Sequence, residues 1–205
     1  MRDAYQYLDP DYTYTDPQTG VLRNLANVTN QDDLLFLESA SVLKRAKELE
    51  KKPIKIKDAK ALLAIHQYLF QDVYQWAGKM RTVNISKAGK PFIETNFFEA
   101  SFNYIDTLIG DYRSLEKIDL KRIAQKLAEI LDAINFLHPF REGNGRTQRE
   151  FIRVLALEHG LTFNLNPPDN ADVYERYMSG TIDGDVAKLA ALIEELAKVE
   201  NRRIL

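Results

Sequence analysis

Apolar side chains recur every three or four positions through most of the chain, and this spacing limits the fold more than any other feature of the sequence. Residues spaced in this way cover one face of an α-helix, and other helices must bury that face. The pattern therefore predicts an all-α fold with a single helical domain. We expect helices over residues 32–50, 58–77, 95–112, 119–137, 146–159 and 185–199, and a short one that begins near Asn170.

Several of these helices carry signals for where they begin and end. Thr95 and Asp119 each precede an apolar run, and their side chains can accept hydrogen bonds from first-turn amides, so we expect both to be N-caps. Gly78 and Gly160 follow apolar runs and are expected to end their helices.

A single stretch has the pattern of strands. Residues 82–85 alternate in polarity, residues 87–90 contain Gly89 and read as a turn, and an extended pattern resumes at Phe92 and Ile93. This predicts a short β-hairpin within about residues 81–93. The pattern alone leaves open whether the hairpin only covers the core.

Residues 1–30 are expected to form an irregular arm ahead of a domain formed by residues 31–205. Pro17 and Gly20 favour a turn in this segment. Tyrosines at positions 5, 7, 12 and 14 supply enough aromatic surface for the arm to pack on the domain. An arm that binds a partner is the alternative.

Composition excludes several classes of function. The chain has no cysteine, which rules out disulfides, zinc–thiolate sites and a cysteine nucleophile. Its three histidines argue against a metal site built of histidine alone. The formal net charge of −2 argues against direct binding of nucleic acid, and no apolar run is long enough to cross a membrane.

Residues 138–149 (HPFREGNGRTQR) connect one expected helix to the next and contain the residues best suited to chemistry. His138 precedes Pro139, and a residue before proline is disfavoured in the α region, so the chain should leave the helix there and direct the imidazole into the loop. Histidine is the side chain best able to accept a proton near neutral pH. A structural histidine is the alternative when His138 is considered alone.

The second half of this segment is typical of an anion site. Gly143 and Gly145 permit positive φ and close approach of a ligand, and amides at a helix start attract anions. Arg146 and Arg149 are three residues apart, so they should share a helix face and bind phosphate oxygens, with the Asn144 side chain as a further donor. The set favours a polyphosphate, whereas Gly-x-Gly alone would indicate only a turn.

Glu142 is an acidic residue among these cations and has two possible roles. It could form a salt bridge with Arg146 or Arg149. It could instead hold Mg²⁺, which proteins commonly bind through one carboxylate together with phosphate oxygens of the substrate.

Residues 138–149 resemble the signature of the Fic-domain family, His-Pro-Phe-x-Asp/Glu-Gly-Asn-Gly-Arg-x-x-Arg, at every specified position. A second segment, from His66 to Gly78 and on to Arg81, is similar to the family's upstream helix and its exit into a flap. The resemblance covers residues from about 24 to about 196. It implies a protein adenylyltransferase, which moves AMP from Mg-ATP to a Ser, Thr or Tyr hydroxyl of a target protein and releases pyrophosphate.

The resemblance also implies roles for individual residues. His138 would deprotonate the target hydroxyl, and Glu142 would hold Mg²⁺. The hairpin would be a flap that docks the target by adding a strand to an exposed edge. The residues implied to bind nucleotide are Gly143, Asn144, Gly145, Arg146 and Arg149, and those implied to dock the target are Val83, Asn84, Ile85 and Phe92. A glycine at position 145, where kinase-like members carry lysine, implies the nucleotide orientation that transfers AMP.

Regulation is implied by a further comparison with the family. Many members carry an inhibitory helix, Ser/Thr-x-x-x-Glu-Gly/Asn, whose glutamate pairs with the second arginine of the signature. Ser39 and Ser41 lack that glutamate, and Leu196 stands where Glu200 and Asn201 would require Ser or Thr. The resemblance therefore implies a toxin in the bacterial cytoplasm, held by a small antitoxin that brings a glutamate to Arg149.

The target is not legible in the residues, although the resemblance makes bacterial type II topoisomerase subunits plausible targets. Fic domains of type IV effectors, which are delivered into a host cell, have a similar pattern. Two further functions stay open: transfer of another nucleotide or phosphoester by the same site, and a nucleotide-binding interaction module without turnover.

Overall fold

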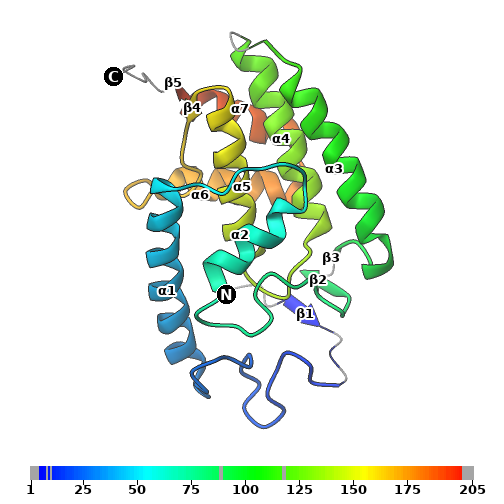
Figure 1. Ribbon diagram of the computed structural model, residues 1–205, viewed down its shortest axis with the longest axis vertical. Coiled ribbons are helices and arrows are strands. Elements are labelled where there is room, and N and C mark those ends of the chain that lie inside the picture. Colours follow the sequence, from blue (N-terminus) through cyan, green and yellow to red (C-terminus); the bar gives the residue numbers. More distant parts are fainter. Residues whose placement is uncertain (1–4, 8, 10, 88–89, 117–118, 200–205) are drawn as a thin grey trace.

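The computed structural model describes residues 5–7, 9, 11–87, 90–116 and 119–199, and it is mostly helical (Figure 1). The helices of this described part are α1 (Gln31–Lys51), α2 (Ala61–Phe70), α3 (Phe98–Arg113), α4 (Leu120–Leu137), α5 (Asn144–Glu158), α6 (Ala171–Asp183) and α7 (Val186–Leu196), with a 3-10 turn η1 (Thr95–Phe97) ahead of α3. The strands are β1 (Tyr5–Tyr7), β2 (Ile85–Lys87), β3 (Lys90–Pro91), β4 (Leu161–Thr162) and β5 (Lys198–Val199). The expected all-α fold class with a small hairpin is confirmed.

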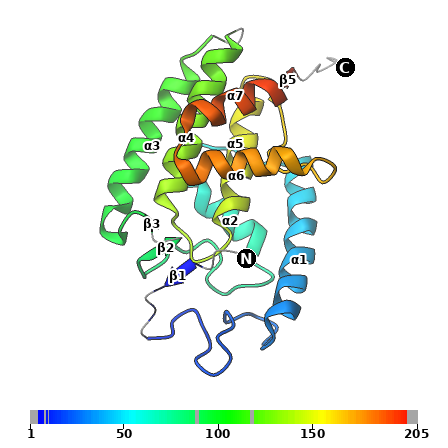
Figure 2. The same cartoon turned by 180° about the vertical axis from the view of Figure 1, so that it is seen from behind.

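Helix α4 forms the centre of the core. It packs against α3, α5 and α7, and Figure 1 and Figure 2 show it between α3 and α5 from both sides. Its largest buried side chains are Ile123, Leu127, Ile130, Leu131, Ile134 and Leu137. Truncating such a leucine to alanine costs about 2–5 kcal/mol. Because both α4 and α5 are anchored here, the loop between them is held at both ends.

The observed helix ends show which of the capping and stop signals in the sequence were interpreted correctly. The Asp119 carboxylate accepts the main-chain N–H of Arg122, so the expected N-cap of α4 is confirmed. Thr95 differs, because it begins the 3-10 turn η1 and α3 starts only at Phe98. Gly160 has a φ of +71° and follows the last turn of α5, as expected of a helix stop.

Helix α2 is shorter than the apolar pattern predicts. It ends at Phe70, and the next residues form turns in which the Phe70 carbonyl accepts the amides of both Val73 and Tyr74. Tertiary hydrogen bonds replace helical ones here, since Leu25 donates its N–H to Val73 and Gly78 donates its N–H to the His66 ring. The prediction of a helix to residue 77 was wrong because it read buried residues in a turn as a helix face.

The expected hairpin forms with shorter strands. β2 pairs antiparallel with β3, with Ser86 opposite Pro91, and the turn residues 88 and 89 lie outside the described residues. Val83 and Asn84 precede β2 and are not part of a strand, contrary to expectation. Two features were not expected: β1 pairs with the other side of β2, and β4 pairs with β5, so that α7 ends at Leu196.

Residues 11–30 run along the turns that follow α2. Tyr14 is buried, its hydroxyl accepts the N–H of Thr82, and its ring contacts the Trp76 ring edge-on. Asn30 then caps α1 by accepting the amides of Asp32 and Asp33. In the described part of the chain, no helix combines the length and apolar character needed to span a bilayer.

Candidate active site

His138 ends α4 in a strained backbone conformation. Its φ of 42° and ψ of 60° are left-handed, which costs an L-residue about 1–2 kcal/mol. The sequence predicted an exit from the helix at this residue, and the structure shows that the exit is a left-handed turn into Pro139. The residue is buried, and its main-chain N–H still bonds to Ile134.

Hydrogen bonding assigns the tautomer of the His138 imidazole. Its Nδ1 lies 2.9 Å from the main-chain oxygen of Asn135. Because a carbonyl oxygen can only accept, Nδ1 carries the proton, and in the neutral ring Nε2 then carries the lone pair. The ring is stacked on the Phe92 ring with centroids 3.7 Å apart, which fixes its plane. The geometry therefore presents Nε2 as the basic atom.

Arg81 joins the hairpin to this histidine. Its guanidinium is buried and donates from Nε to the His138 carbonyl at 2.9 Å. The two terminal nitrogens donate to Val83 and Ile93, one on each side of the hairpin, at 2.6 Å. Burial lowers the pKa of Arg81 to about 10, so the side chain stays charged at neutral pH. One side chain thus sets the position of the hairpin relative to the imidazole.

His66 supports the loop between α4 and α5 by a hydrogen bond to its backbone. Its Nδ1 accepts the N–H of Gly78, so the neutral ring must donate from Nε2 to the main-chain oxygen of Glu142 at 3.0 Å. The ring is stacked on Phe140 with centroids 3.8 Å apart and on Phe70 at 4.5 Å. Burial lowers the pKa of His66 to about 3, which keeps it neutral. This histidine therefore has a structural role, because it holds the backbone of the loop.

The start of α5 is shaped by Gly143 and Asn144. Gly143 has a φ of +82° and lies against the Phe70 ring, so a Cβ there would clash with the ring. Asn144 is buried, and its side chain accepts the N–H of Phe140 and donates to the Phe140 carbonyl. This side chain therefore closes the loop through the Phe140 backbone, and its role as a phosphate donor stays a prediction. The backbone amides of residues 143–145 lie at the amino end of α5.

The two arginines of the motif diverge, although their spacing predicted a shared face. Arg146 reaches α1, where its Nη1 lies 2.6 Å from Glu38, and its Nη2 lies 3.5 Å from Glu142. Arg149 turns toward α6, with its guanidinium 5.6 Å from the Tyr174 ring and 5.4 Å from the Tyr177 ring. The amino end of α5 therefore lies between two cations held by different helices.

Glu142 is a partly exposed carboxylate at the amino end of α5. Its side chain is 32% exposed, and Oε1 accepts the N–H of Gly143 besides facing Arg146. Within the described ranges, no group of three or more metal-binding side chains occurs. The single exposed carboxylate of Glu142 fits Mg²⁺ at a site where substrate phosphates and water would supply the other ligands.

The hairpin residues that were expected to dock a target differ from one another in burial and in contacts. Ile85 is buried, Asn84 accepts the N–H of Thr95, and Phe92 is stacked on His138. Sequence reasoning missed Glu38 and the tyrosines beside Arg149. No local pattern could have identified them, because they come from α1 and α6 and meet the motif only in three dimensions.

Comparisons with known proteins show which family the chain belongs to. The model of the Fic/DOC family matches residues 56–156. The chain is 41% identical over 148 residues to protein adenylyltransferase VbhT of Bartonella schoenbuchensis, covering 72% of this chain and 31% of VbhT. It is 35% identical to y4lH of Sinorhizobium fredii, described as a probable protein adenylyltransferase, covering 88% of this chain and 93% of that protein. The match thus spans about a third of VbhT and nearly all of y4lH.

The same fold occurs in BepC of Bartonella tribocorum, a VirB-translocated effector protein solved with bound AMPPNP. That structure has a TM-score of 0.78 and 21% identity and covers 92% of this chain and 97% of its own. The extent and identity of the match to y4lH place the sequence within one family. This chain belongs to the Fic/DOC family.

Proposed function

We propose that this protein is a protein adenylyltransferase, which moves AMP from ATP to a hydroxyl group of a target protein. The observation that carries the proposal is the His138 imidazole, whose basic Nε2 belongs to a loop that leads directly into the amino end of α5. A base and an anion site are thereby fixed by one short segment. The names of VbhT and y4lH and the nucleotide analogue bound to BepC support this function.

In the proposed reaction, the oxygen of the target hydroxyl attacks the α-phosphorus of ATP. Nε2 of His138 accepts the hydroxyl proton, the bond from the α-phosphorus to the bridging oxygen breaks, and pyrophosphate leaves. The amides at the start of α5, together with Arg146 and Arg149, stabilise the negative charge on the phosphates. Glu142 would hold Mg²⁺, which would supply further positive charge to the leaving phosphates.

The hairpin would present the target to His138. Because β1 already pairs with one side of β2, the side of the hairpin that is open to a further strand, among the described strands, is that of β3. Phe92 follows β3 directly and touches the imidazole. We therefore propose that the target segment pairs along the β3 side, where its hydroxyl would come within reach of Nε2.

We further propose that a separate small protein controls the enzyme as an antitoxin, by bringing a glutamate to Arg149. Arg149 takes part in none of the ion pairs among the described residues, and its guanidinium contacts tyrosine rings instead. A glutamate placed there would occupy donors that the terminal phosphate needs. Mg-ATP as co-substrate places such an enzyme in a cytoplasm, that of the bacterium or, for a delivered effector, that of a host cell.

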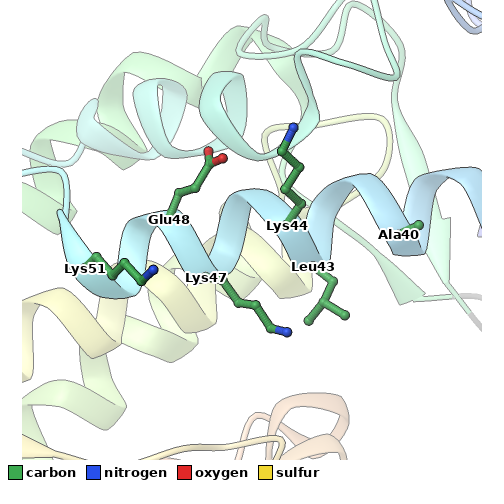
Figure 3. A pocket seen from close by; sticks show the side chains of 6 residues that line it. All are labelled: Ala40, Leu43, Lys44, Lys47, Glu48 and Lys51. Carbon is green, nitrogen blue, oxygen red and sulfur yellow. The ribbon is translucent and has the colours of Figure 1, made fainter.

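The outer face of α1 supports the presence of such a partner. An open groove of about 430 Å³ runs along this helix and is lined by Ala40, Leu43, Lys44, Lys47, Glu48 and Lys51. Figure 3 shows these side chains. Leu43 is 58% exposed, and Phe36 on the same helix is 78% exposed. Apolar side chains rimmed by lysines fit an amphipathic helix with acidic residues.

The test of the proposed function uses ATP labelled at either the α- or the γ-phosphate, with Mg²⁺ and the purified protein. Targets are a bacterial lysate and a purified type II topoisomerase subunit. We expect protein labelling from the α-phosphate alone, lost in His138→Ala, because only the base is removed. His159→Ala is the matched control, since His159 lies at the other end of α5, and it should label normally.

Different outcomes would point to different functions. Labelling from the γ-phosphate would mean phosphorylation and would overturn the proposal. Labelling from another α-labelled nucleotide instead of ATP would change the transferred group. No labelling, combined with calorimetric binding of Mg-ATP, would indicate an interaction module without turnover. Growth arrest on expression of the parent chain, but not of His138→Ala, is expected of a toxin.

A further inference from the structure

Glu38 is a buried carboxylate at the middle of α1, a helix to which the motif gave no catalytic role. It is 5% exposed, and its Oε1 lies 2.6 Å from Nη1 of Arg146. Its Oε2 accepts a short hydrogen bond from the Tyr74 hydroxyl. A carboxylate removed from water is costly unless it is paired and hydrogen-bonded, and these two partners meet that need. Burial and the nearby Glu38 charge raise the pKa of Tyr74, so its hydroxyl remains a donor.

Arg146 is fixed in two independent ways by its surroundings. Its guanidinium lies over the Phe70 ring, 4.8 Å from the centroid, which sets the plane of the group. Glu38 binds one terminal nitrogen, which sets its rotation within that plane. The side chain keeps 28% of its surface exposed at the amino end of α5, and a guanidinium has five N–H donors. Donors therefore remain for a ligand after Glu38 is bound.

The two acidic residues at Arg146 differ in how firmly they are held. Glu142 is 32% exposed, lies 3.5 Å away and belongs to the loop where the proposed metal binds. Glu38 is buried, closer, and tied to Tyr74 on its second oxygen. If Glu142 turns to a metal, Glu38 remains as the acidic partner that keeps the guanidinium from following it. Glu38 is therefore suited to hold Arg146 permanently, whereas Glu142 is suited to exchange Arg146 for a metal.

We propose that Glu38 is a positioning residue, which holds the Arg146 guanidinium in the orientation that binds the terminal phosphates of the nucleotide. The inference rests on the proposed function, because it assumes that Arg146 binds nucleotide. An arginine side chain that is ordered before the ligand arrives loses less conformational freedom on binding. Glu38 therefore raises the affinity for a triphosphate without touching it.

The chain contains a matched control for this arrangement. Glu48, further along α1, accepts a hydrogen bond from the Tyr68 hydroxyl at 3.0 Å and pairs with Arg45 at 3.0 Å. It repeats the tyrosine–glutamate–arginine set on the same helix, with partners that belong neither to the loop nor to α5. Glu48→Gln therefore reports the effect of losing such a carboxylate where no phosphate is expected to bind.

The experiment measures Mg-ATP affinity by titration calorimetry in the His138→Ala protein, in which turnover is blocked. Glu38→Gln, Arg146→Gln, their combination and Glu48→Gln are each added to that background. We expect Glu38→Gln to weaken binding about tenfold when Arg146 is present and to have no further effect in Arg146→Gln. Glu48→Gln should leave the affinity unchanged. Melting curves establish that each variant is folded.

The cycle separates positioning from a general structural effect. The inference is overturned if Glu38→Gln binds as tightly as its parent, or if it loses the same factor with and without Arg146. Tighter binding would also overturn it, since Glu38 would then compete with phosphate for Arg146. If the His138→Ala parent does not bind Mg-ATP at all, the proposed function itself fails, and the inference falls with it.

Discussion

The guanidinium of Arg81 donates a hydrogen bond of 2.9 Å to the main-chain carbonyl of His138, the residue whose side chain is the proposed base. The same guanidinium binds Val83 and Ile93, so it links the base to both sides of the hairpin. The Arg81 N–H adds a bond to Pro139. A strained residue persists only where its surroundings fix it, and these bonds supply that constraint for His138.

Arg81→Lys is therefore expected to impair use of the target more than binding of ATP. An ammonium group cannot match the planar fork that reaches three carbonyls, so the hairpin should shift relative to His138. We expect KM for a target protein to rise about tenfold, with Mg-ATP affinity unchanged, in steady-state labelling and calorimetry.

Arg113→Lys provides the control for this prediction. Arg113 also donates to two main-chain carbonyls, those of Ile56 and Lys57, but it lies away from the loop. Its replacement should leave the KM for the target unchanged. An equal rise in both variants would show that Arg81 acts only through general stability.

Acid stability should depend on His66, because burial lowers its pKa from the ordinary 6.5 to about 3. Between these values the unfolded chain binds a proton that the folded chain does not. The free energy of unfolding should therefore decrease as pH falls below 6.5, by at most about 1.4 kcal/mol per pH unit, until pH 3. Urea unfolding at pH 7 and pH 5 measures this difference. In His66→Gln the part of the decrease due to His66 should vanish, and an unchanged pH dependence would contradict the assignment.

The long helices and the motif could be predicted because the information for them is local. The apolar stripe of α4 ends at Leu137, and the Asp119 carboxylate caps the same helix. Each of these signals involves only residues a few positions apart in the sequence. The end of α2 could not be predicted, since it depends on bonds from Leu25 and to His66. The pairing of β4 with β5 likewise joins distant segments.

The candidate site shows the same division. The motif predicted which residues gather between α4 and α5, since all of them belong to one segment. It could not predict that the Asn144 side chain binds the Phe140 backbone, because the same amide could bind a phosphate or a loop. Nor could it predict Glu38, which reaches Arg146 only after α1 packs on α2.

The two glycines of the motif should respond differently to alanine. Gly143→Ala places a Cβ against the Phe70 ring at a φ of +82°, so we expect a loss of about 1–3 kcal/mol in the free energy of unfolding. Gly145 is helical, and a Cβ there would lie 3.3 Å from the flexible end of Arg149. Gly145→Ala should keep or slightly raise stability, by up to about 1 kcal/mol, while it weakens Mg-ATP binding.

Urea unfolding and calorimetry on the two variants together test the nucleotide orientation. If Gly145→Ala binds and transfers as well as the parent, the space beside Arg149 is not where the phosphates lie. If Gly143→Ala is as stable as the parent, the loop has another conformation available to it.

Arg149→Ala should separate triphosphate binding from binding of shorter nucleotides. Its guanidinium is held over the rings of Tyr174 and Tyr177, on a different helix from the partner of Arg146, and the terminal phosphate would lie there. Removing it should weaken ATP binding about tenfold while AMP binding changes little, because AMP does not reach that position. Calorimetry with both nucleotides gives the ratio of the two affinities, and Arg122→Ala, at an exposed arginine on α4, is the control.

Arg149→Ala should also escape an antitoxin that acts through Arg149, so its residual activity should respond less when that antitoxin is added. Equal inhibition of variant and parent would mean that the partner acts elsewhere, for example on the groove of α1 alone.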